Sequence, residues 1–531
     1  MVPAHFICSG NSVATVFRQQ WRKVCNIQSL RLPESVTTVI LSAFRLVPLV
    51  LLGLGVAAST TTAMANAAGV DFKSCSIGSD NATLVGECAS LDVPLDHGDP
   101  DGRKISLALA RIKANRRSTS KDPLTIIAGG PGQSAIESFA AVAPAFRHIL
   151  KDRDLILIDQ RGTGSSYPLQ CDTTPDSTAL ELDPDLDKVR DDARICYQKQ
   201  DIDTRFFTSS VAVKDIEWVR ELLGIDKWNI YGISYGTRVA LHYLRRYPDK
   251  VRTLILDAVV PPTIVLGPDI APLAQRSLDL VFARCRASDD CQARFPNIQS
   301  DTDKLFADLE TSPRLVTYED VATGQLKEIT FTRNHLAVTI RLMSYNALTA
   351  ALIPSMLSDA ISNDNFAPLA RQADLQTKAL GNSLATGLHH AVVCTEDAPF
   401  MSEAIESTSG QSSYLGDDVV DTLIASCESW PAGQIDDDFK DAVSSDVPTL
   451  ILSGSADPVT PPAYGNLVAE NLSRQVHLII EDQGHMQSPL GCIPQIMAQL
   501  VATASVDSLS LDCIERIHTP AFFVDANGPL P

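Results

Sequence analysis

Residues 228–238 read Trp-Asn-Ile-Tyr-Gly-Ile-Ser-Tyr-Gly-Thr-Arg, and this stretch decides the fold. An apolar, β-prone run over residues 228–233 ends in a Gly-x-Ser-x-Gly pattern, and a helix-like run over residues 237–247 follows before Pro248. The pattern predicts a strand, a tight turn and a helix, with Ser234 at the apex. Such a turn exposes the serine hydroxyl at the carboxyl edge of a sheet, over a helix N-terminus that favours developing negative charge. A chance pattern in a loop is the simpler interpretation, and the flanking strand and helix argue against it.

Apolar runs that are typical of buried strands recur on both sides of this turn. Helix-like runs, such as residues 210–223 and 463–472, separate several of them. This alternation predicts a mostly parallel sheet with helices on both faces. The expected strands cover residues 123–127, 154–159, 251–262, 447–454 and 476–481, after an antiparallel hairpin within residues 75–113.

The strand–helix rhythm breaks in two places. Residues 171–205 are acidic and are predicted to be irregular. Residues from 271 to about 390 have helical periodicity, with runs over residues 273–282 and 336–352, and predict an inserted helical cap. Caps of this sort cover a site and choose its substrate. The predicted organisation is a leader over residues 1–67, a core over 68–265, the cap over 266–390 and the rest of the core over 391–531.

Three residues fall at the carboxyl ends of predicted strands and could act together. Ser234 is the nucleophile candidate, Asp457 follows the penultimate strand, and His485 follows the last one. A serine hydroxyl is a poor nucleophile until a base takes its proton, and histidine titrates near neutral pH. An acid holds the imidazole tautomer and stabilises the imidazolium. The order serine, acid, histidine is that of the α/β-hydrolase fold, which is the predicted fold class.

Rival residues exist for the acid and for the base. Asp257 also ends a predicted strand, but the Gly-x-x-Asp-Pro turn favours Asp457. His477 lies inside a predicted strand and is expected to be packed, while His389 and His390 lie near the end of the cap. His485 is preferred because it follows the final strand in a Gly-His turn.

A glycine-rich turn, Ala-Gly-Gly-Pro-Gly-Gln-Ser over residues 128–134, directly follows a predicted central strand. It lacks the Lys-Ser/Thr pair of a phosphate-binding loop. Near a serine nucleophile it suits an oxyanion hole, with one amide from Gly130 and the second from Tyr235. A simple tight turn is the alternative. Asp159 and Arg161, after the next strand, are expected to brace the surrounding loops rather than to react.

The composition excludes some partners and indicates export. A net charge of -20 makes nucleic acid and anionic lipid poor partners. Residues 46–58 form an apolar run after Arg45, and small residues near Ala65 and Ala67 offer cleavage sites. This is a signal-peptide layout, too short for a membrane anchor, and predicts a periplasmic or extracellular protein.

The cysteines agree with an exported chain. Ten of the twelve follow the leader, and they fall into neighbouring couples. We expect disulfides between these neighbours, because short loops close most easily. Buried free thiols are the alternative. The spacings typical of a zinc site are missing from the sequence, and nothing in it requires a metal or cofactor. The couples are Cys75 with Cys88, Cys171 with Cys196, Cys285 with Cys291, Cys394 with Cys427, and Cys492 with Cys513.

Three motifs in this order, over residues 128–132, 159–165 and 232–236, resemble exported α/β-hydrolase serine peptidases of the proline iminopeptidase and tripeptidyl aminopeptidase group. Cys-Glu-Ser-Trp-Pro from Cys427, and the run over residues 453–461, are similar to the TAP-like C-terminal region of that group. The resemblance extends from about residue 88 to residue 513. Ala128 departs from it, since proline iminopeptidases usually carry histidine there, and this favours the tripeptidyl type.

The resemblance implies peptide substrates and release of residues from their N-termini. An exopeptidase must bind a free ammonium group, and a carboxylate in a partly dry pocket is the natural anchor. Glu396, then Asp397, are the candidates, with an ordinary ion pair as the alternative reading. An esterase or lipase on the same scaffold, and a catalytically silent binding protein, are the competing functions. The sequence leaves the oligomeric state and the residue preference open.

Overall fold

The computed structural model describes residues 70–79, 82–116, 120, 122–171, 185–408, 412–525 and 527–529. All of them belong to one compact unit, Asn66–Pro531. The predicted signal segment lies outside the described residues. Among the helices that the structure describes, none is long and apolar enough to cross a membrane.

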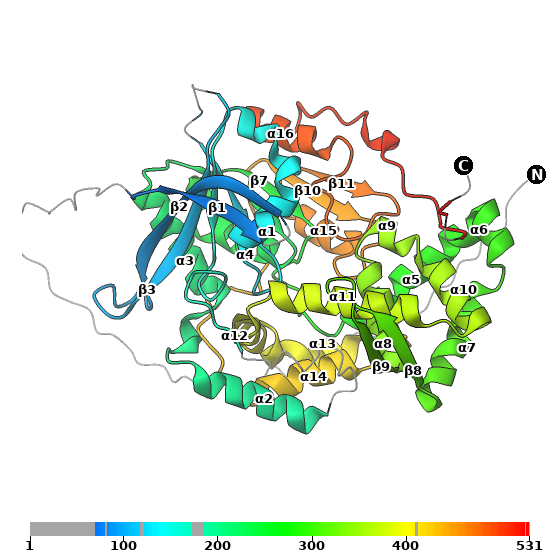
Figure 1. Cartoon of the computed structure of the whole chain (residues 1–531). Helices are drawn as coiled ribbons and strands as arrows, with labels where there is room; N and C mark the ends of the chain where they lie inside the picture. Colours follow the sequence, from blue (N-terminus) through cyan, green and yellow to red (C-terminus); the bar gives the residue numbers. More distant parts are fainter. Residues whose placement is uncertain are drawn as a thin grey trace, which may run out of the picture. The chain divides into compact units, whose positions relative to one another are not determined.

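A nine-stranded sheet forms the centre of this unit, in the order β1-β2-β3-β5-β4-β6-β7-β10-β11 (Figure 1). The pairings β1–β2, β2–β3 and β3–β5 are antiparallel, and every later pairing is parallel. The predicted mostly parallel sheet and its antiparallel start are therefore confirmed. The strands are β1 (Lys73–Ser79), β2 (Ala82–Pro94), β3 (Lys104–Ile112), β4 (Leu124–Ile127), β5 (Leu155–Ile158), β6 (Trp228–Ile233), β7 (Val251–Asp257), β10 (Thr449–Gly454) and β11 (Gln475–Ile480).

Helices cover both faces of the sheet because the central strands are apolar on both sides. Ile230 packs into the cluster that includes α3 and α4, whereas its neighbour Tyr231 packs into the cluster that includes α1 and α16. Successive strand side chains point to opposite faces, so each face needs its own layer. The layers use α1 (Ala135–Val142) and α16 (Ile493–Thr503) on one face, and α3 (Ser209–Leu222), α4 (Tyr235–Arg246) and α15 (Pro462–Ala469) on the other.

The region between β7 and α12 has a hydrophobic cluster of its own, and Figure 1 shows its helices in green to yellow. It is mainly helical, as predicted, but it also contains a two-stranded antiparallel sheet of β8 and β9. Alternating exposed and buried residues along β8 are the pattern of a half-buried strand. The elements are α5 (Ile270–Ala287), α6 (Asp289–Arg294), α7 (Ile298–Thr311), β8 (Arg314–Glu319), β9 (Leu326–Phe331), α8 (Arg333–Met343), α9 (Ala347–Ala350), α10 (Ile353–Asn363) and α11 (Ala367–Ser383).

Four further helices border the core. The prediction that residues 171–205 are irregular is wrong for residues 186–199, which form α2. The Asp185 side chain caps this helix by accepting from the amides of Asp187 and Lys188. The sequence of the helix is rich in charged residues and lacks an apolar stripe, because the helix buries few of its side chains. The helices are α2 (Leu186–Lys199), α12 (Thr386–Glu396), α13 (Met401–Thr408) and α14 (Asp418–Cys427) with α2 packed against α14.

The five expected disulfides are all formed between neighbouring cysteines, which confirms the sequential pairing. The bond Cys394–Cys427 ties α12 to α14. The bond Cys171–Cys196 holds α2 to the chain that follows β5.

Candidate active site

Ser234 occupies a strained turn between β6 and α4. Its backbone has φ 53° and ψ −130°, a conformation that non-glycine residues rarely adopt. A side chain on Gly236 would come within 2.2 Å of the Ile127 carbonyl oxygen, so glycine is required there. The Ser234 amide donates to the carbonyl of Asp257 at 2.9 Å, which ties the turn to the end of β7. The strand–turn–helix prediction is confirmed.

Asp457 and His485 lie at the carboxyl ends of β10 and β11 and are hydrogen-bonded to each other. The distance from His485 Nδ1 to Asp457 Oδ2 is 2.9 Å. The other oxygen, Asp457 Oδ1, accepts from the amides of Val459 and Thr460, and the Thr460 hydroxyl donates to Oδ2 at 2.7 Å. The carboxylate is completely buried. It therefore fixes the orientation of the imidazole ring and leaves Nε2 for other chemistry.

The interaction between Asp457 and His485 raises the pKa of the histidine and lowers the pKa of the aspartate. Burial alone would lower the pKa of His485, but the charge and hydrogen bond of Asp457 outweigh it and raise that pKa. Burial alone would raise the pKa of Asp457, but His485 and the donors around Thr460 hold it below its usual value. Each group thus stabilises the charged form of the other.

A loop of the cap holds His485 from the other side. The His485 amide donates to the Tyr345 carbonyl at 2.8 Å, and the two rings meet edge to face at 5.2 Å. The sequence predicted one helical run over residues 336–352. The structure breaks it between α8 and α9, where Asn346 caps α9, and the break exposes the Tyr345 carbonyl to the histidine loop.

Asp257 joins the nucleophile turn to the histidine loop. Its carbonyl accepts from the Ser234 amide, while its carboxylate accepts from the amides of Gln487 and Ser488, each at 2.8 Å, and from the Tyr231 hydroxyl. Burial raises the pKa of Asp257, and the hydrogen bonds from Gln487 and Tyr231 oppose that rise. The rival acid is therefore engaged with backbone amides, whereas Asp457 is the carboxylate bonded to His485 Nδ1.

These contacts bring Ser234 and His485 to the same edge of the sheet. In the described part of the chain, no hydrogen bond joins the Ser234 hydroxyl to the imidazole. Catalytic hydrogen bonds are often long before substrate binds and tighten in the complex. Among the rival histidines, His477 is bonded to Ser453 and Asn466 and is packed as expected.

The glycine-rich turn lies against the nucleophile. A side chain added to Gly129 would come within 3.0 Å of the Ser234 Cβ, and Gly130 has φ +108°. Tyr235 is the first residue of α4, where backbone amides have no partner within the helix. Both amides expected to form an oxyanion hole are therefore on segments next to Ser234. The Ala385 amide, which precedes α12, donates to the Gly132 carbonyl at 2.9 Å and holds this turn.

Asp159 and Arg161 are bracing residues. The Asp159 carboxylate accepts from the Ser134 hydroxyl and the Ile136 amide at the start of α1. Arg161 makes two hydrogen bonds of 2.6 Å with Asp215 on α3. Both side chains are buried, and both connect loops to helices as the sequence indicated.

Glu396 and Asp397 lie at the end of α12, and their side chains have no exposed surface. Asp397 pairs with Arg238 at 2.9 Å and with Lys440 at 3.0 Å. Glu396 accepts from the amide and the hydroxyl of Ser209, and the same hydroxyl lies 2.6 Å from the Tyr235 hydroxyl. Burial raises the pKa of Glu396 to about 7, against the opposing effect of the Arg238 charge.

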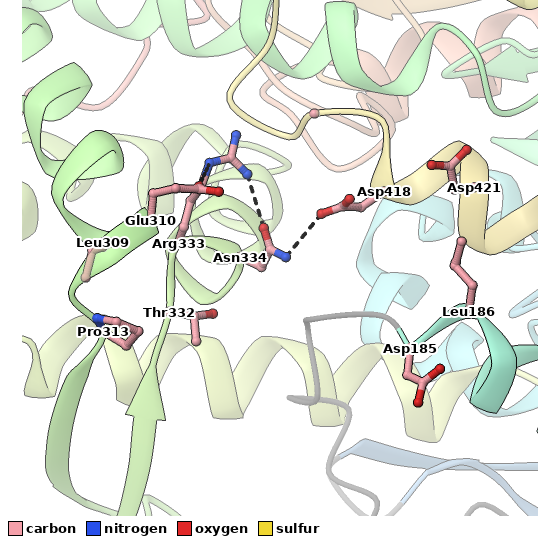
Figure 2. Close-up of a pocket in the computed structure, with 11 residues that line it drawn as sticks. Asp185, Leu186, Leu309, Glu310, Pro313, Thr332, Arg333, Asn334, Asp418 and Asp421 are labelled. Atoms are coloured by element: carbon pink, nitrogen blue, oxygen red, sulfur yellow. Dashed lines mark hydrogen bonds and ion pairs between the residues drawn. The ribbon is translucent and has the colours of Figure 1, made fainter.

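A pocket of about 630 Å³ lies elsewhere, between α2, the end of α7, the start of α8 and α14 (Figure 2). Arg333 is paired with Glu310 on one wall, and Asn334 donates to Asp418 across the opening. Neither Ser234 nor His485 lines this space, so it is separate from the candidate catalytic residues. Its lining residues are Asp185, Leu186, Leu309, Glu310, Pro313, Thr332, Arg333, Asn334, Gly416, Asp418 and Asp421.

Comparison with known proteins agrees with this arrangement. The family model of the alpha/beta hydrolase fold matches residues 122–294, and that of TAP-like proteins matches residues 412–513. Serine protease Hip1 of Mycobacterium tuberculosis is 27% identical over 429 residues, which are 72% of this chain and 79% of that protein. Tripeptidyl aminopeptidase of Streptomyces lividans is 31% identical over 221 residues, 39% of this chain and 41% of that protein. Carboxylesterase B of Mycobacterium tuberculosis is 30% identical over 270 residues, which are 46% of this chain and 51% of that protein.

The sheet order, the serine turn and the family match together define the class: the chain belongs to the α/β hydrolases. Within that class it is a serine hydrolase of the peptidase group that carries a TAP-like C-terminal region.

Proposed function

We propose that the chain is an exported serine exopeptidase that releases residues from the N-termini of peptides. The observation that carries this proposal is the strained Ser234 turn at the sheet edge that also holds the hydrogen-bonded Asp457–His485 pair. The relatives named as a serine protease and a tripeptidyl aminopeptidase support peptide substrates. The five disulfides among the described residues support an oxidising compartment.

The proposed reaction proceeds through an acyl-enzyme. His485 Nε2 takes the proton of the Ser234 hydroxyl as its oxygen attacks the carbonyl carbon of the scissile bond. The amides of Gly130 and Tyr235 donate to the oxyanion that forms, a contribution of about 10²–10³-fold for each donor. The imidazolium, held by Asp457, then gives its proton to the leaving amine. Water, activated in turn by His485, hydrolyses the ester and frees Ser234.

The free ammonium of the substrate needs an anion, and Glu396 remains our first candidate, with Asp397 second. Glu396 is favoured because Asp397 has two cationic partners, Arg238 at 2.9 Å and Lys440 at 3.0 Å, whereas Glu396 lies farther from Arg238, at 3.8 Å. The Ser209 hydroxyl connects the carboxylate of Glu396 to the hydroxyl of Tyr235, the residue after the proposed nucleophile. Because its carboxylate is fully buried, an ammonium reaches it only when the surrounding segment opens.

Mass spectrometry of the products from a defined peptide tests the proposal. We expect N-terminal fragments to appear with wild-type enzyme, and Ser234→Ala to abolish them. Glu396→Gln should reduce cleavage of free peptides and leave N-acetylated peptides at their low wild-type rate. Internal cleavage of N-acetylated peptides at undiminished rate would contradict the exopeptidase assignment, and equal losses on both substrates would argue against an ammonium anchor.

An esterase is the second candidate, and the resemblance to carboxylesterase B supports it. The same serine, histidine and acid would serve both reactions, so the substrate decides between them. Chromogenic aminoacyl and tripeptidyl amides should be assayed beside short acyl esters. Hydrolysis of esters without hydrolysis of any amide would favour the esterase.

A further inference from the structure

Among the residues that the structure describes, several buried hydrogen-bond donors in or beside the cap have no acceptor, and three of them lie near the Asp457–His485 pair. They are Nη1 of Arg276 on α5, Nε of Arg341 on α8, and the hydroxyl of Tyr414. Tyr414 is only 7% exposed. A buried polar group that lacks a partner costs free energy comparable to a lost hydrogen bond, so three such donors in one region need an explanation. We call these three residues the cap donor cluster.

Arg341 is connected to the catalytic histidine through one aromatic ring. Its guanidinium carbon lies 5.7 Å from the centre of the Tyr345 ring, and that ring lies 5.2 Å from the His485 ring. The guanidinium is therefore within about 11 Å of the imidazole. Three residues of extended chain span about 10 Å, so a peptide bound at Ser234 can reach this position within a few residues.

Arg276 lies on α5, and Tyr414, from the segment before α14, contacts the same helix. Arg276 donates through Nη2 to the Ser455 carbonyl at 2.6 Å, two residues before Asp457. The Tyr414 amide donates to the side-chain oxygen of Gln275, the residue before Arg276, at 3.0 Å. Burial raises the pKa of the Tyr414 phenol, and the nearby charge of Arg341 opposes this rise. The three donors thus share one neighbourhood.

The cluster is cationic and has no acid of its own. Within the described ranges, neither Arg276 nor Arg341 forms an ion pair, although the chain has 64 acidic residues and a net charge of -20. Burial lowers the pKa of Arg276, and the charge of Asp457 opposes this effect only in part, so the buried charge is incompletely compensated. An anion placed here would satisfy the free N–H and O–H groups and offset the desolvation of the cations.

We infer that the cap donor cluster binds a substrate carboxylate that lies within about three residues of the scissile bond. Resting on the proposed peptidase function, this inference makes short peptides with a free C-terminus, or peptides with an acidic side chain near the cleavage point, the favoured substrates. Arg341 and Arg276 supply the charge, and the Tyr414 hydroxyl supplies a neutral donor. The cluster acts on binding, not on the reacting atoms.

Pairs of peptides that differ only in a C-terminal carboxylate or carboxamide test this inference. A second pair replaces aspartate by asparagine near the scissile bond, so the two arms distinguish the main-chain carboxylate from a side chain. We expect wild-type enzyme to prefer the carboxylate member of at least one pair by roughly tenfold in kcat/KM, the size of a charge-assisted hydrogen bond. Arg341→Gln should remove this preference by raising KM for the acid, with the amide changed by less than about twofold.

Arg333→Gln is the matched control, because this arginine lies on the same helix but is paired with Glu310. It should leave the preference intact. Tyr414→Phe removes an oxygen that makes no hydrogen bond, so it should fold even if Arg341→Gln does not, and it should weaken the preference about threefold. An unchanged preference in folded Arg341→Gln or Tyr414→Phe, or equal losses on both members of each pair, would overturn the inference.

Failure of the peptidase proposal would be visible separately. If only esters are cleaved, the same comparison applies to ester pairs that differ in one distal carboxylate. A carboxylate preference among esters that Arg341→Gln removes would support the cluster while the peptidase proposal falls.

Discussion

Replacing Asp257 by asparagine should separate the nucleophile turn from the histidine loop without touching either side chain. In the folded chain its carbonyl holds the Ser234 amide, and its carboxylate holds the amides of Gln487 and Ser488. Asparagine keeps one accepting oxygen but presents an NH₂ group where the second acceptor was. One of the two loop amides is then left facing a donor in a buried position.

The magnitude follows from these two contacts. Hydrogen bonds to charged groups contribute about 1.5–3 kcal/mol, and an unsatisfied buried donor costs about 1–3 kcal/mol. If roughly 2 kcal/mol of this energy serves to hold His485 in line with Ser234, its loss raises the activation free energy by the same amount and lowers kcat about 30-fold. KM should change little, because Asp257 is buried below the site and does not line it. The charge of Asp257 also helps to raise the pKa of His485, so its loss should lower that pKa.

The assay is the pH dependence of kcat and kcat/KM on one chromogenic substrate, measured for wild type, Asp257→Asn and Tyr231→Phe. His485 acts as a base only when neutral, so the acid limb of kcat/KM reports its pKa and should move to lower pH in Asp257→Asn. Tyr231→Phe removes one neutral donor and keeps both amide bonds, so its loss should be only a few-fold. A folded Asp257→Asn enzyme with wild-type kcat and an unmoved acid limb would refute this reasoning.

Three further changes test the site. Asp457→Asn should lower kcat by about 10³–10⁴-fold with KM nearly constant, because the imidazole loses the partner that sets its tautomer, as steady-state kinetics would show. Thr460→Val removes one of the hydrogen bonds to that carboxylate and should lower kcat about three- to tenfold on the same substrate. Burial raises the pKa of Glu396 in the folded chain to about 7, above the ordinary value of 4.5, so its contribution to stability is present below pH 4.5 and is lost as the pH rises to about 7. Urea unfolding at several pH values should therefore show that the free energy of unfolding of the wild type falls by roughly 3 kcal/mol relative to that of Glu396→Gln between pH 4.5 and 7. Free energies of unfolding that change in parallel with pH in the two proteins would contradict this prediction.

The sequence was most informative where burial and local conformation act together. The run that ends at Ser234 is apolar on both sheet faces, and its glycines meet the backbone so closely that larger side chains cannot fit. Strand and turn were therefore predictable from residue type alone. The ends of β10 and β11 were found in the same way, and they place Asp457 and His485 at one edge of the sheet because parallel strands share that edge.

Other features depend on contacts that are distant in the chain. Only the capping residue Asn346 marks the break after α8 locally, and the hydrogen bond of Tyr345 with His485 joins residues that are 140 positions apart. The helix α2 was missed because its surface is charged almost all round. Asp257 was considered as an acid, but its bonds to the Gln487 and Ser488 amides could not be read from its own neighbourhood.

The candidate catalytic residues sit on the sheet, yet the groups that hold their loops come largely from outside it. The Tyr345 carbonyl, between two cap helices, accepts from His485, and the Ala385 amide, just before α12, donates to the glycine-rich turn. At the end of α12, Glu396 binds Ser209, whose hydroxyl meets the side chain of Tyr235 behind the nucleophile. Three points of the chain between β7 and β10 therefore contact the His485 loop, the glycine-rich turn and, through Ser209, the helix that follows Ser234. Because hydrogen bonds hold donor and acceptor to within a few tenths of an ångström, this part of the chain helps to position Ser234 and His485.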